Sequence, residues 1–335
     1  MAYKQEYMEL AIELAKKGTG AVNPNPLVGA VIVKDDRIIG QGYHARYGDL
    51  HAERAAFASL TEDAAGAEMY VTLEPCCHYG KQPPCTQAIV EHGIKKVYVG
   101  SDDPNDKVAG KGITFLREHG VAVETGVMKD ACDAINPVFF HYITTKLPYV
   151  VMKYAMSMDG KIAAYTGKSQ WITGEAARQH VVTRNWLKGI MVGCNTVLQD
   201  DPALTCRIEG GRNPIRIVCD SHLRIPLDCQ LVRTAENVPT IVATLDGASD
   251  KAKELKQANV QILQCKEKDG RIDLYNLMVK LGTQDIDGIL LEGGGTLNEQ
   301  ALAQDIVQEV QVYIAPKIIG GAEAKTPVEG KGVPD

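Results

Sequence analysis

The chain has 335 residues, of which 45% are apolar and 23% charged, with a formal net charge of −6 and a sequence pI near 5.8. This length predicts two domains, and the composition excludes a disordered or low-complexity protein. The acidic balance argues against a protein that works on a nucleic-acid backbone, because phosphate neutralisation supplies most of the affinity in such proteins.

The N-terminal segment and the cysteines indicate the compartment. Met1 to Lys17 is charged and amphipathic and lacks the apolar core of a signal peptide. No apolar run is long enough to span a bilayer. The nine cysteines, most of them single residues in apolar surroundings, suit a reducing compartment in which thiols stay free or bind metal. We therefore expect a cytoplasmic protein that contacts no membrane.

Helix and strand signals alternate through the first half of the chain. We expect helices at residues 3–17, 51–60, 85–92, 113–119 and 131–144, and strands at 28–33, 37–42, 68–73, 97–100 and 121–125. The Asn23-Pro24-Asn25-Pro26 segment ends the first helix, because residues before proline avoid helical backbone. These elements predict a three-layer α/β domain over residues 1–146.

A new apolar run begins after Lys146-Leu147-Pro148, and the alternation repeats in a second domain over residues 147–335. Its expected strands are 149–156, 190–193, 215–219, 240–243, 260–263, 289–291 and 310–314, and its expected helices are 175–187, 250–258, 273–281 and 297–304. The chain ends in the turn-like segment 330–335, soon after a strand. Since an α/β domain seldom stops there, we expect that a C-terminal piece is missing.

Two short motifs predict a zinc site. His51-Ala52-Glu53 and Glu74-Pro75-Cys76 match the H-x-E and P-C-x-x-C signature that the zinc deaminases share. One neutral imidazole and two thiolates leave a zinc ion with no net charge and with an open position, where the pKa of water falls to about 7. Glu53 is the expected proton carrier between that water, the substrate ring and the leaving amine.

The second cysteine of the signature departs from the pattern, because Tyr79 stands where it is expected. Cys85 and Cys77 are the two candidates for the third ligand. Cys85 is favoured, since it opens a helix as the motif requires and since adjacent residues such as Cys76 and Cys77 rarely reach one tetrahedral ion together. Buried free cysteines and an ordinary histidine remain the alternative, but the combination of motifs favours the metal site.

The segment Thr72 to Cys85 resembles the deaminase half of the bifunctional riboflavin-biosynthesis deaminase/reductase family, in which the long cysteine spacing is normal. Residues 23–29 and 42–44 fit the same family, and residues 153–161, 169–173, 193–202 and 292–297 resemble the motifs of its reductase half. The resemblance covers nearly the whole chain. It implies an α/β protein with an N-terminal three-layer cytidine-deaminase-like domain and a C-terminal dihydrofolate-reductase-like domain, with Zn²⁺ and NADPH as cofactors.

The resemblance also implies the chemistry. The first half would hydrolyse the 2-amino group of 2,5-diamino-6-(5-phosphoribosylamino)pyrimidin-4-one. The second half would reduce the ribosyl chain with NADPH to give 5-amino-6-(5-phosphoribitylamino)uracil. The partner would thus be a small phosphoribosylaminopyrimidine and not nucleic acid. The family generally forms homo-oligomers, but no feature of the sequence fixes the number of subunits.

Site residues follow from the same motifs. The deaminase substrate would contact Asn23, His44, His78 and Lys81, and the reductase substrate Ser169, Arg184, Leu204, Arg207 and Glu292. Lys153 and Glu292 would orient the ring-opened sugar for hydride attack. NADPH would contact Ala155, Trp171, Thr173, Thr196, Asp200, Ser221, Gly294, Gly295, Thr296 and Leu297, with Ser221 and Arg224 as candidates for its 2′-phosphate.

Several features allow a second interpretation. A glycine run such as 293–295 is most often a tight turn, although at a strand end before a helix it also lets backbone amides approach a pyrophosphate. The loop 102–106 could line the substrate pocket through Asn105, or be an acidic solvated loop. The whole chain could be a deaminase of nucleic acid or of a free base with a non-catalytic second domain, which the intact motifs around Lys153, Asp200 and Glu292 oppose.

Overall fold

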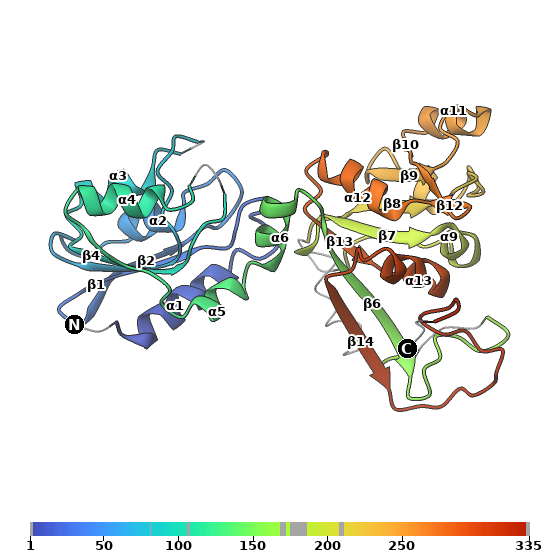
Figure 1. The fold of residues 1–335 in the computed structure, drawn as a ribbon, viewed down its shortest axis with the longest axis horizontal. Helices are drawn as coiled ribbons and strands as arrows, with labels where there is room; N and C mark the ends of the chain where they lie inside the picture. The colour runs from blue at the N-terminus through green and yellow to red at the C-terminus, as the bar shows by residue number, and fades with distance from the viewer. Residues whose placement is uncertain are drawn as a thin grey trace. The chain divides into compact units, whose positions relative to one another are not determined.

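The computed structural model describes residues 3–80, 82–105, 108–167, 172–174, 186–207 and 211–332. The chain divides into two compact units, Met1–Thr145 and Lys146–Asp335. Each unit is built around one large sheet with helices beside it, as Figure 1 shows. None of the helices in the described ranges combines the length and the apolar character that a membrane span requires.

The first unit alternates helices and strands along the chain. Its helices are α1 (Gln5–Lys16), α2 (Ala52–Ala58), α3 (Cys85–Glu91), α4 (Lys111–Glu118), α5 (Lys129–Asp133) and α6 (Pro137–Thr145). Its strands are β1 (Gly29–Lys34), β2 (Arg37–Tyr43), β3 (Glu68–Leu73), β4 (Lys96–Ser101) and β5 (Ala122–Glu124), in the order β2-β1-β3-β4-β5. Strand β1 runs antiparallel to β2 and β3, whereas β3, β4 and β5 are parallel.

Helices cover both faces of this first sheet. Successive strand residues point to opposite faces, so Ile32 and Met69 pack in one core cluster with residues of α2, α3 and α4. Their neighbours Val31 and Tyr70 pack in another cluster with residues of α1 and α5. Figure 1 shows α2, α3 and α4 on one side of the sheet and α1 and α5 on the other. The three-layer arrangement predicted from the sequence is confirmed.

The single helix predicted over residues 131–144 is wrong. The chain forms α5 and α6 instead, with Asn136 between them. Pro137 can begin a helix, but it disfavours helical backbone at the residue before it. The buried Asn136 side chain turns away to exchange two hydrogen bonds with Leu27, accepting from its N–H at 2.7 Å and donating to its carbonyl at 2.8 Å. The two hydrogen bonds of Asn136 also hold the segment that follows α1, because Leu27 belongs to it.

The second unit has a seven-stranded sheet and a small hairpin. The strands of the sheet are β6 (Tyr149–Ser157), β7 (Gly189–Gly193), β8 (Ile215–Cys219), β9 (Thr240–Thr244), β10 (Gln261–Gln264), β13 (Gly288–Leu291) and β14 (Glu309–Ala315). The hairpin is β11 (Glu267–Lys268) with β12 (Arg271–Ile272), and the helices are α9 (Cys194–Asp200), α10 (Gln230–Arg233), α11 (Asp250–Gln257), α12 (Leu274–Gly282) and α13 (Gly295–Ala303). Most of the helix predicted over residues 175–187 lies outside the described residues.

All pairs in this sheet are parallel, in the order β10-β9-β8-β7-β13-β6-β14. One face packs on α12 and α13 in a continuous apolar core that includes Met152, Ile289 and Leu277. Because the strands are parallel, their carboxyl ends meet at one edge, where ligands of such sheets usually bind. The segments after β7, β8 and β13 therefore come together, although the ends of β7 at Gly193 and of β13 at Leu291 are 98 residues apart in the sequence.

Candidate active sites

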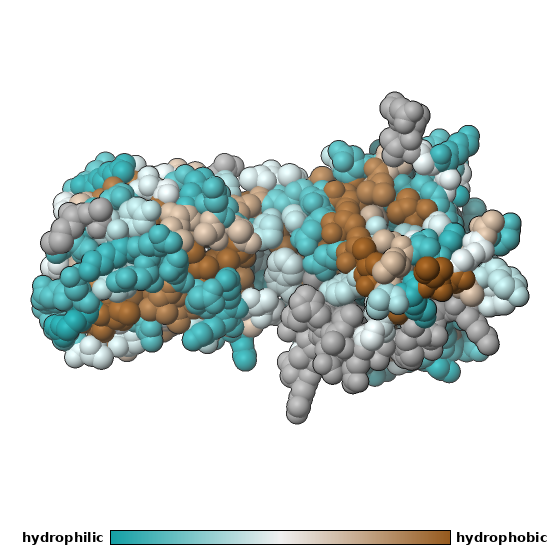
Figure 2. Space-filling view, turned by 90° about the horizontal axis from the view of Figure 1, so that it is seen from below, coloured by the Kyte–Doolittle hydropathy of each residue, from teal (hydrophilic) through white to brown (hydrophobic). Residues whose placement is uncertain are grey.

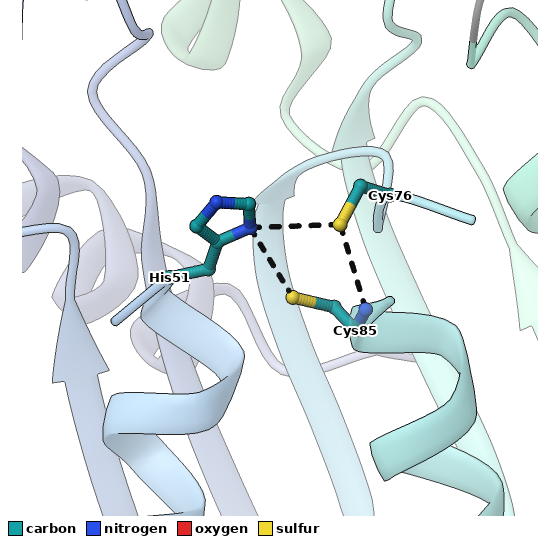
Figure 3. A group of neighbouring side chains, drawn as sticks. All are labelled: His51, Cys76 and Cys85. Carbon is teal, nitrogen blue, oxygen red and sulfur yellow. Dashed lines mark hydrogen bonds between the residues drawn. The ribbon is translucent and has the colours of Figure 1, made fainter. Parts of the chain in front are cut away.

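Three elements of the first unit bring the predicted metal ligands together. His51 is the residue before α2, Cys76 follows the end of β3, and Cys85 is the first residue of α3. Their side chains point toward one another, as Figure 3 shows. Within the described part of the chain, they are the one group of three or more His, Cys, Asp or Glu side chains that could hold a metal ion.

The spacing of these side chains fits a tetrahedral zinc ion. His51 Nδ1 lies 3.5 Å from Cys76 Sγ and 3.5 Å from Cys85 Sγ. With zinc–sulfur bonds of about 2.3 Å and zinc–nitrogen bonds of about 2.0–2.1 Å, a tetrahedral ion places such a sulfur–nitrogen pair about 3.5 Å apart. All three ligand atoms lie within 4.8 Å of one another. The site can therefore hold zinc with little rearrangement.

The electrostatics of the cluster also suit a cation. Contact with the Cys85 thiol, followed by the hydrogen bond with His51, lowers the pKa of Cys76. The same contact raises the pKa of Cys85 well above its usual value. A metal ion displaces the thiol protons when it binds, because its ligands are thiolates.

Glu53 lies beside the ligands on the first turn of α2. It is only 4% exposed, and burial raises the pKa of its carboxyl. Both Glu53 and the ligand residues His51 and Cys76 line one pocket, here called the zinc-site pocket. A buried carboxyl with a raised pKa at such a position can accept a proton and return it.

The structure brings some of the predicted substrate residues to the zinc-site pocket. His44 and His78 line it, whereas Asn23 is not among the described residues of its lining and Lys81 lies outside the described residues. Asn25 lines it instead, with its amide nitrogen 3.1 Å from His44 Nε2. No local sequence signal distinguishes Asn25 from Asn23, because both precede prolines in the same loop.

Asp103 and Asn105 also line this pocket, and both belong to the loop that the sequence marks as a candidate for the pocket wall. Asp103 is 8% exposed, burial raises its pKa to about 6, and it accepts a hydrogen bond from Asn105 N–H at 2.8 Å. The carboxylate of Glu74 holds the neighbouring backbone, because it accepts from the N–H groups of Gly110 and Gly112 at 3.0 Å. Asp103 and Asn105 are thus part of the pocket wall.

In the second unit, Lys153 and Glu292 form an ion pair. Lys153 lies on β6 and Glu292 directly follows β13, and these two strands are neighbours. Lys153 Nζ is 3.5 Å from Glu292 Oε1, with side chains 17% and 12% exposed. Lys153 Nζ also lies 5.7 Å from the centre of the Tyr313 ring on β14. The pair can hold a polar substrate group in place at the carboxyl ends of the strands.

A second pocket, here called the nucleotide pocket, lies at the same strand ends. Of the predicted cofactor residues, it brings together Thr196, Ser221, Gly294, Thr296 and Leu297. The backbone of Gly294, at φ +98°, precedes α13 with no side-chain cap, so the first amides of this helix can meet an anion. The Thr296 hydroxyl is committed elsewhere, because it donates to Glu329 at 2.7 Å.

Other predicted residues of this unit lie elsewhere. A Cβ on Gly295 would meet Glu329 Cγ at 2.5 Å, so packing explains this glycine. Asp200 and Arg207 are exposed, Leu204 is buried, and none of them lines the nucleotide pocket, nor do Ala155 or Thr173. The remaining predicted residues, Ser169, Trp171 and Arg184, lie outside the described residues.

Two protein families match the chain. The cytidine and deoxycytidylate deaminase zinc-binding region matches residues 1–101, and the RibD C-terminal domain matches residues 148–335. The riboflavin biosynthesis protein RibD of Actinobacillus pleuropneumoniae is 54% identical over 329 residues, which cover 98% of this chain and 88% of that protein. RibD of Escherichia coli strain K12 is 40% identical over 94% of this chain and 88% of its own length.

Solved structures agree with these matches. A diaminohydroxyphosphoribosylaminopyrimidine deaminase/5-amino-6-(5-phosphoribosylamino)uracil reductase from Thermotoga maritima superposes with a TM-score of 0.87 at 38% identity, covering 99% of this chain and 92% of that one. RibD of Acinetobacter baumannii gives a TM-score of 0.88 at 38% identity, covering 98% and 91%. The predicted fold class is confirmed, and a non-catalytic second domain is not favoured.

Proposed function

The chain belongs to the RibD family of riboflavin biosynthesis proteins, and from this membership we propose which of its residues perform each of its two reactions. The enzyme is bifunctional: it deaminates 2,5-diamino-6-(5-phosphoribosylamino)pyrimidin-4-one and then reduces the ribosyl chain with NADPH. We assign the deaminase to residues 1–146 and the reductase to residues 147–335. The observation that carries the first assignment is the cluster of His51, Cys76 and Cys85.

In the deaminase, His51, Cys76 and Cys85 would hold zinc, which as a Lewis acid activates a water molecule. Glu53 takes the proton of that water on its buried carboxylate. It delivers this proton to the pyrimidine ring nitrogen, then takes the second proton from the added hydroxyl group and delivers it to the leaving amine. Glu53 is buried beside the ligands and lines the same pocket, which supports this role. Asn23, His44, His78 and Lys81 would hold the substrate.

In the reductase, NADPH supplies the hydride. Lys153 and Glu292 orient the ring-opened sugar, and the 3.5 Å ion pair between them supports a fixed position for both groups. Ser169, Arg184, Leu204 and Arg207 would hold the rest of this substrate. Ala155, Trp171, Thr173, Thr196, Asp200, Ser221 and the segment 294–297 would hold the coenzyme, and of these Thr196, Ser221 and Gly294 line the nucleotide pocket.

We also propose that the protein is a cytoplasmic homo-oligomer. All nine cysteines are free thiols, which suits a reducing compartment. Strand β14 lies at the edge of its sheet, and it exposes the apolar side chains of Val310, Val312 and Ile314. Figure 2 shows apolar side chains gathered in a stripe on this unit. An exposed apolar edge strand favours a contact with a second subunit.

The test follows NADPH consumption after addition of the diaminopyrimidinone phosphate. The unaltered enzyme should consume NADPH, and Glu53→Ala should not, because the reductase receives no deaminated compound. Supplying the deaminated compound should restore consumption by Glu53→Ala. If the unaltered enzyme deaminates its substrate but consumes no NADPH even with the deaminated compound, the assignment of residues 147–335 is wrong.

A further inference from the structure

The nucleotide pocket is cationic in a protein that is acidic overall. Two arginines, Arg224 and Arg271, line it together with His222, and none of the described residues that line it is acidic. The whole chain carries a formal charge of −6. Two guanidinium groups in one pocket of an acidic protein favour a negatively charged ligand group over a neutral hydroxyl group.

Arg224 forms an ion pair with a buried carboxylate. Arg224 Nε lies 3.8 Å from Asp220 Oδ1, and the Asp220 side chain is fully buried at the end of β8. The other Asp220 oxygen accepts from Ile225 N–H at 2.9 Å. The loop that carries Arg224 is fixed again at Ser221, whose carbonyl accepts from Leu245 N–H at 3.2 Å. Arg224 is therefore oriented at its Nε, while half of its side chain stays exposed.

Arg271 reaches the pocket on the β11–β12 hairpin. Asp273 N–H donates to the Lys266 carbonyl at 2.9 Å and closes the hairpin. The Gln300 side chain, on α13, donates to the Ile272 carbonyl and so ties the hairpin to the helix whose first amides face the same pocket. Within the described part of the chain, no carboxylate lies within ion-pair distance of Arg271. Its charge is therefore available to a ligand.

We propose that Arg271, acting with Arg224, selects NADPH over NADH by binding the phosphate on the 2′ position of the adenosine ribose. This inference rests on the reductase function proposed above. Many domains specific for NAD place a carboxylate at a strand end to bind the free 2′-hydroxyl. Here the acid at the end of β8, Asp220, is buried, accepts a hydrogen bond from Ile225 N–H and forms an ion pair with Arg224, so it is not available to a ribose hydroxyl. Guanidinium groups bind phosphate oxygens in pairs and retain their charge at all working pH values.

The test compares Arg271→Gln with Lys268→Gln in the full-length enzyme. Lys268 is the matched control, because it pairs with Arg271 across the hairpin and carries the same charge but is not part of the pocket lining. Binding of 2′,5′-ADP, 5′-ADP, NADPH and NADH is measured by calorimetry at one fixed ionic strength. Arg271→Gln should weaken 2′,5′-ADP and NADPH by about 10- to 100-fold, the effect of losing a charge-assisted contact, and leave 5′-ADP and NADH nearly unchanged.

Each other outcome has a defined meaning. Equal losses for phosphorylated and unphosphorylated ligands in Arg271→Gln would overturn the proposal, as would no loss at all. An equal loss in Lys268→Gln would also overturn it, because the overall charge of the hairpin and not Arg271 would then matter. If the unaltered enzyme binds NADPH and NADH equally, the proposed selection of NADPH is overturned, but the assignment of the reductase stands. If it binds neither coenzyme while its deaminase is active, the reductase assignment itself fails.

Discussion

The two candidates for the third zinc ligand, Cys85 and Cys77, can be distinguished by substitution. Cys85 Sγ lies 3.5 Å from His51 Nδ1, whereas Cys77 lies in a different surface pocket with Lys111 and Phe115. Cys85→Ser should therefore reduce zinc affinity by more than the roughly 10- to 100-fold expected for a residue that only supports a ligand. Cys77→Ser should keep zinc and deaminase activity. Metal analysis after dialysis against a weak chelator measures both variants, and zinc loss in Cys77→Ser would make Cys77 the ligand.

Asp103 predicts a pH dependence of stability. Its pKa is about 6 in the folded enzyme, mainly because of burial, and 3.8 in the unfolded chain. Between these values the folded state binds more protons than the unfolded state, so the contribution of Asp103 to stability falls as the pH rises. Asp103→Asn removes this loss and keeps an oxygen for Asn105 N–H. It should stabilise the first unit by about 1 kcal/mol more at about pH 8 than at about pH 5.

Pulse proteolysis in urea measures this difference, since peptides from residues 1–145 report on the first unit alone. The control is Asp102→Asn, which changes the same charge at an exposed neighbour. A gain that is equal at both pH values would contradict the prediction. So would an equal gain in Asp102→Asn, because the net charge of the loop and not the burial of Asp103 would then be its cause.

Site residues that belong to short sequence motifs could be predicted, whereas residues that reach a pocket through long-range contacts could not. His51 and Glu53 are two residues apart, and the cluster with Cys76 and Cys85 that the motifs predicted is present in the structure. Asp103 and Arg271 enter their pockets from segments with no such signature, since their position depends on how distant elements pack. The glycine run predicted Gly295 as a cofactor contact, but its close packing against Glu329 explains why this residue is a glycine.

Among the elements, the loop from Cys77 to Pro84 separates two zinc ligands and contributes His78 to the zinc-site pocket. Its two prolines have no N–H to bond, so the loop needs external support. Arg54 on α2 supplies it, because its guanidinium donates to the carbonyls of Pro83 at 3.1 Å and Pro84 at 2.9 Å. Helix α2 thus holds the loop as well as the side chain of Glu53.

We expect Arg54→Gln to raise the KM of the deaminase about ten-fold or more, the effect of losing at least one charge-assisted hydrogen bond. The value of kcat and the zinc content should change little, and reduction of the deaminated compound should not change. Arg117→Gln is the matched control, since Arg117 also donates to a carbonyl, that of Val123, which lies outside the loop from Cys77 to Pro84. A similar rise of KM in Arg117→Gln, or none in Arg54→Gln, would show that Arg54 does not position the loop.

Secondary structure could be predicted where burial sets the pattern. The strands β7 and β13 are buried almost throughout, so continuous apolar runs mark them. The β11–β12 hairpin was missed, because Glu267, Lys268 and Arg271 are charged and exposed and give no apolar pattern. Polar hairpins of this kind depend on anchors such as Gln300, which only the folded structure places.

Over the whole molecule, each unit contains its own pocket. Every residue that lines the zinc-site pocket belongs to Met1–Thr145, and every residue that lines the nucleotide pocket belongs to Lys146–Asp335. Among the described residues, no side chain of one unit lines the pocket of the other. The two reactions should therefore be separable by substitution within one chain, and each should serve as the folding control of the other.

This separation predicts that two inactive variants complement each other. Glu53→Gln should lose deamination by about 100-fold or more, the usual effect of removing a general acid or base, and should still reduce the deaminated compound. Lys153→Gln should lose reduction and still deaminate. Mixed in equal amounts with the diaminopyrimidinone phosphate, the two should consume NADPH, because a small-molecule intermediate can leave one chain and enter another. If each variant performs its own half-reaction but the mixture consumes no NADPH, the intermediate must pass between the two pockets of one chain without release.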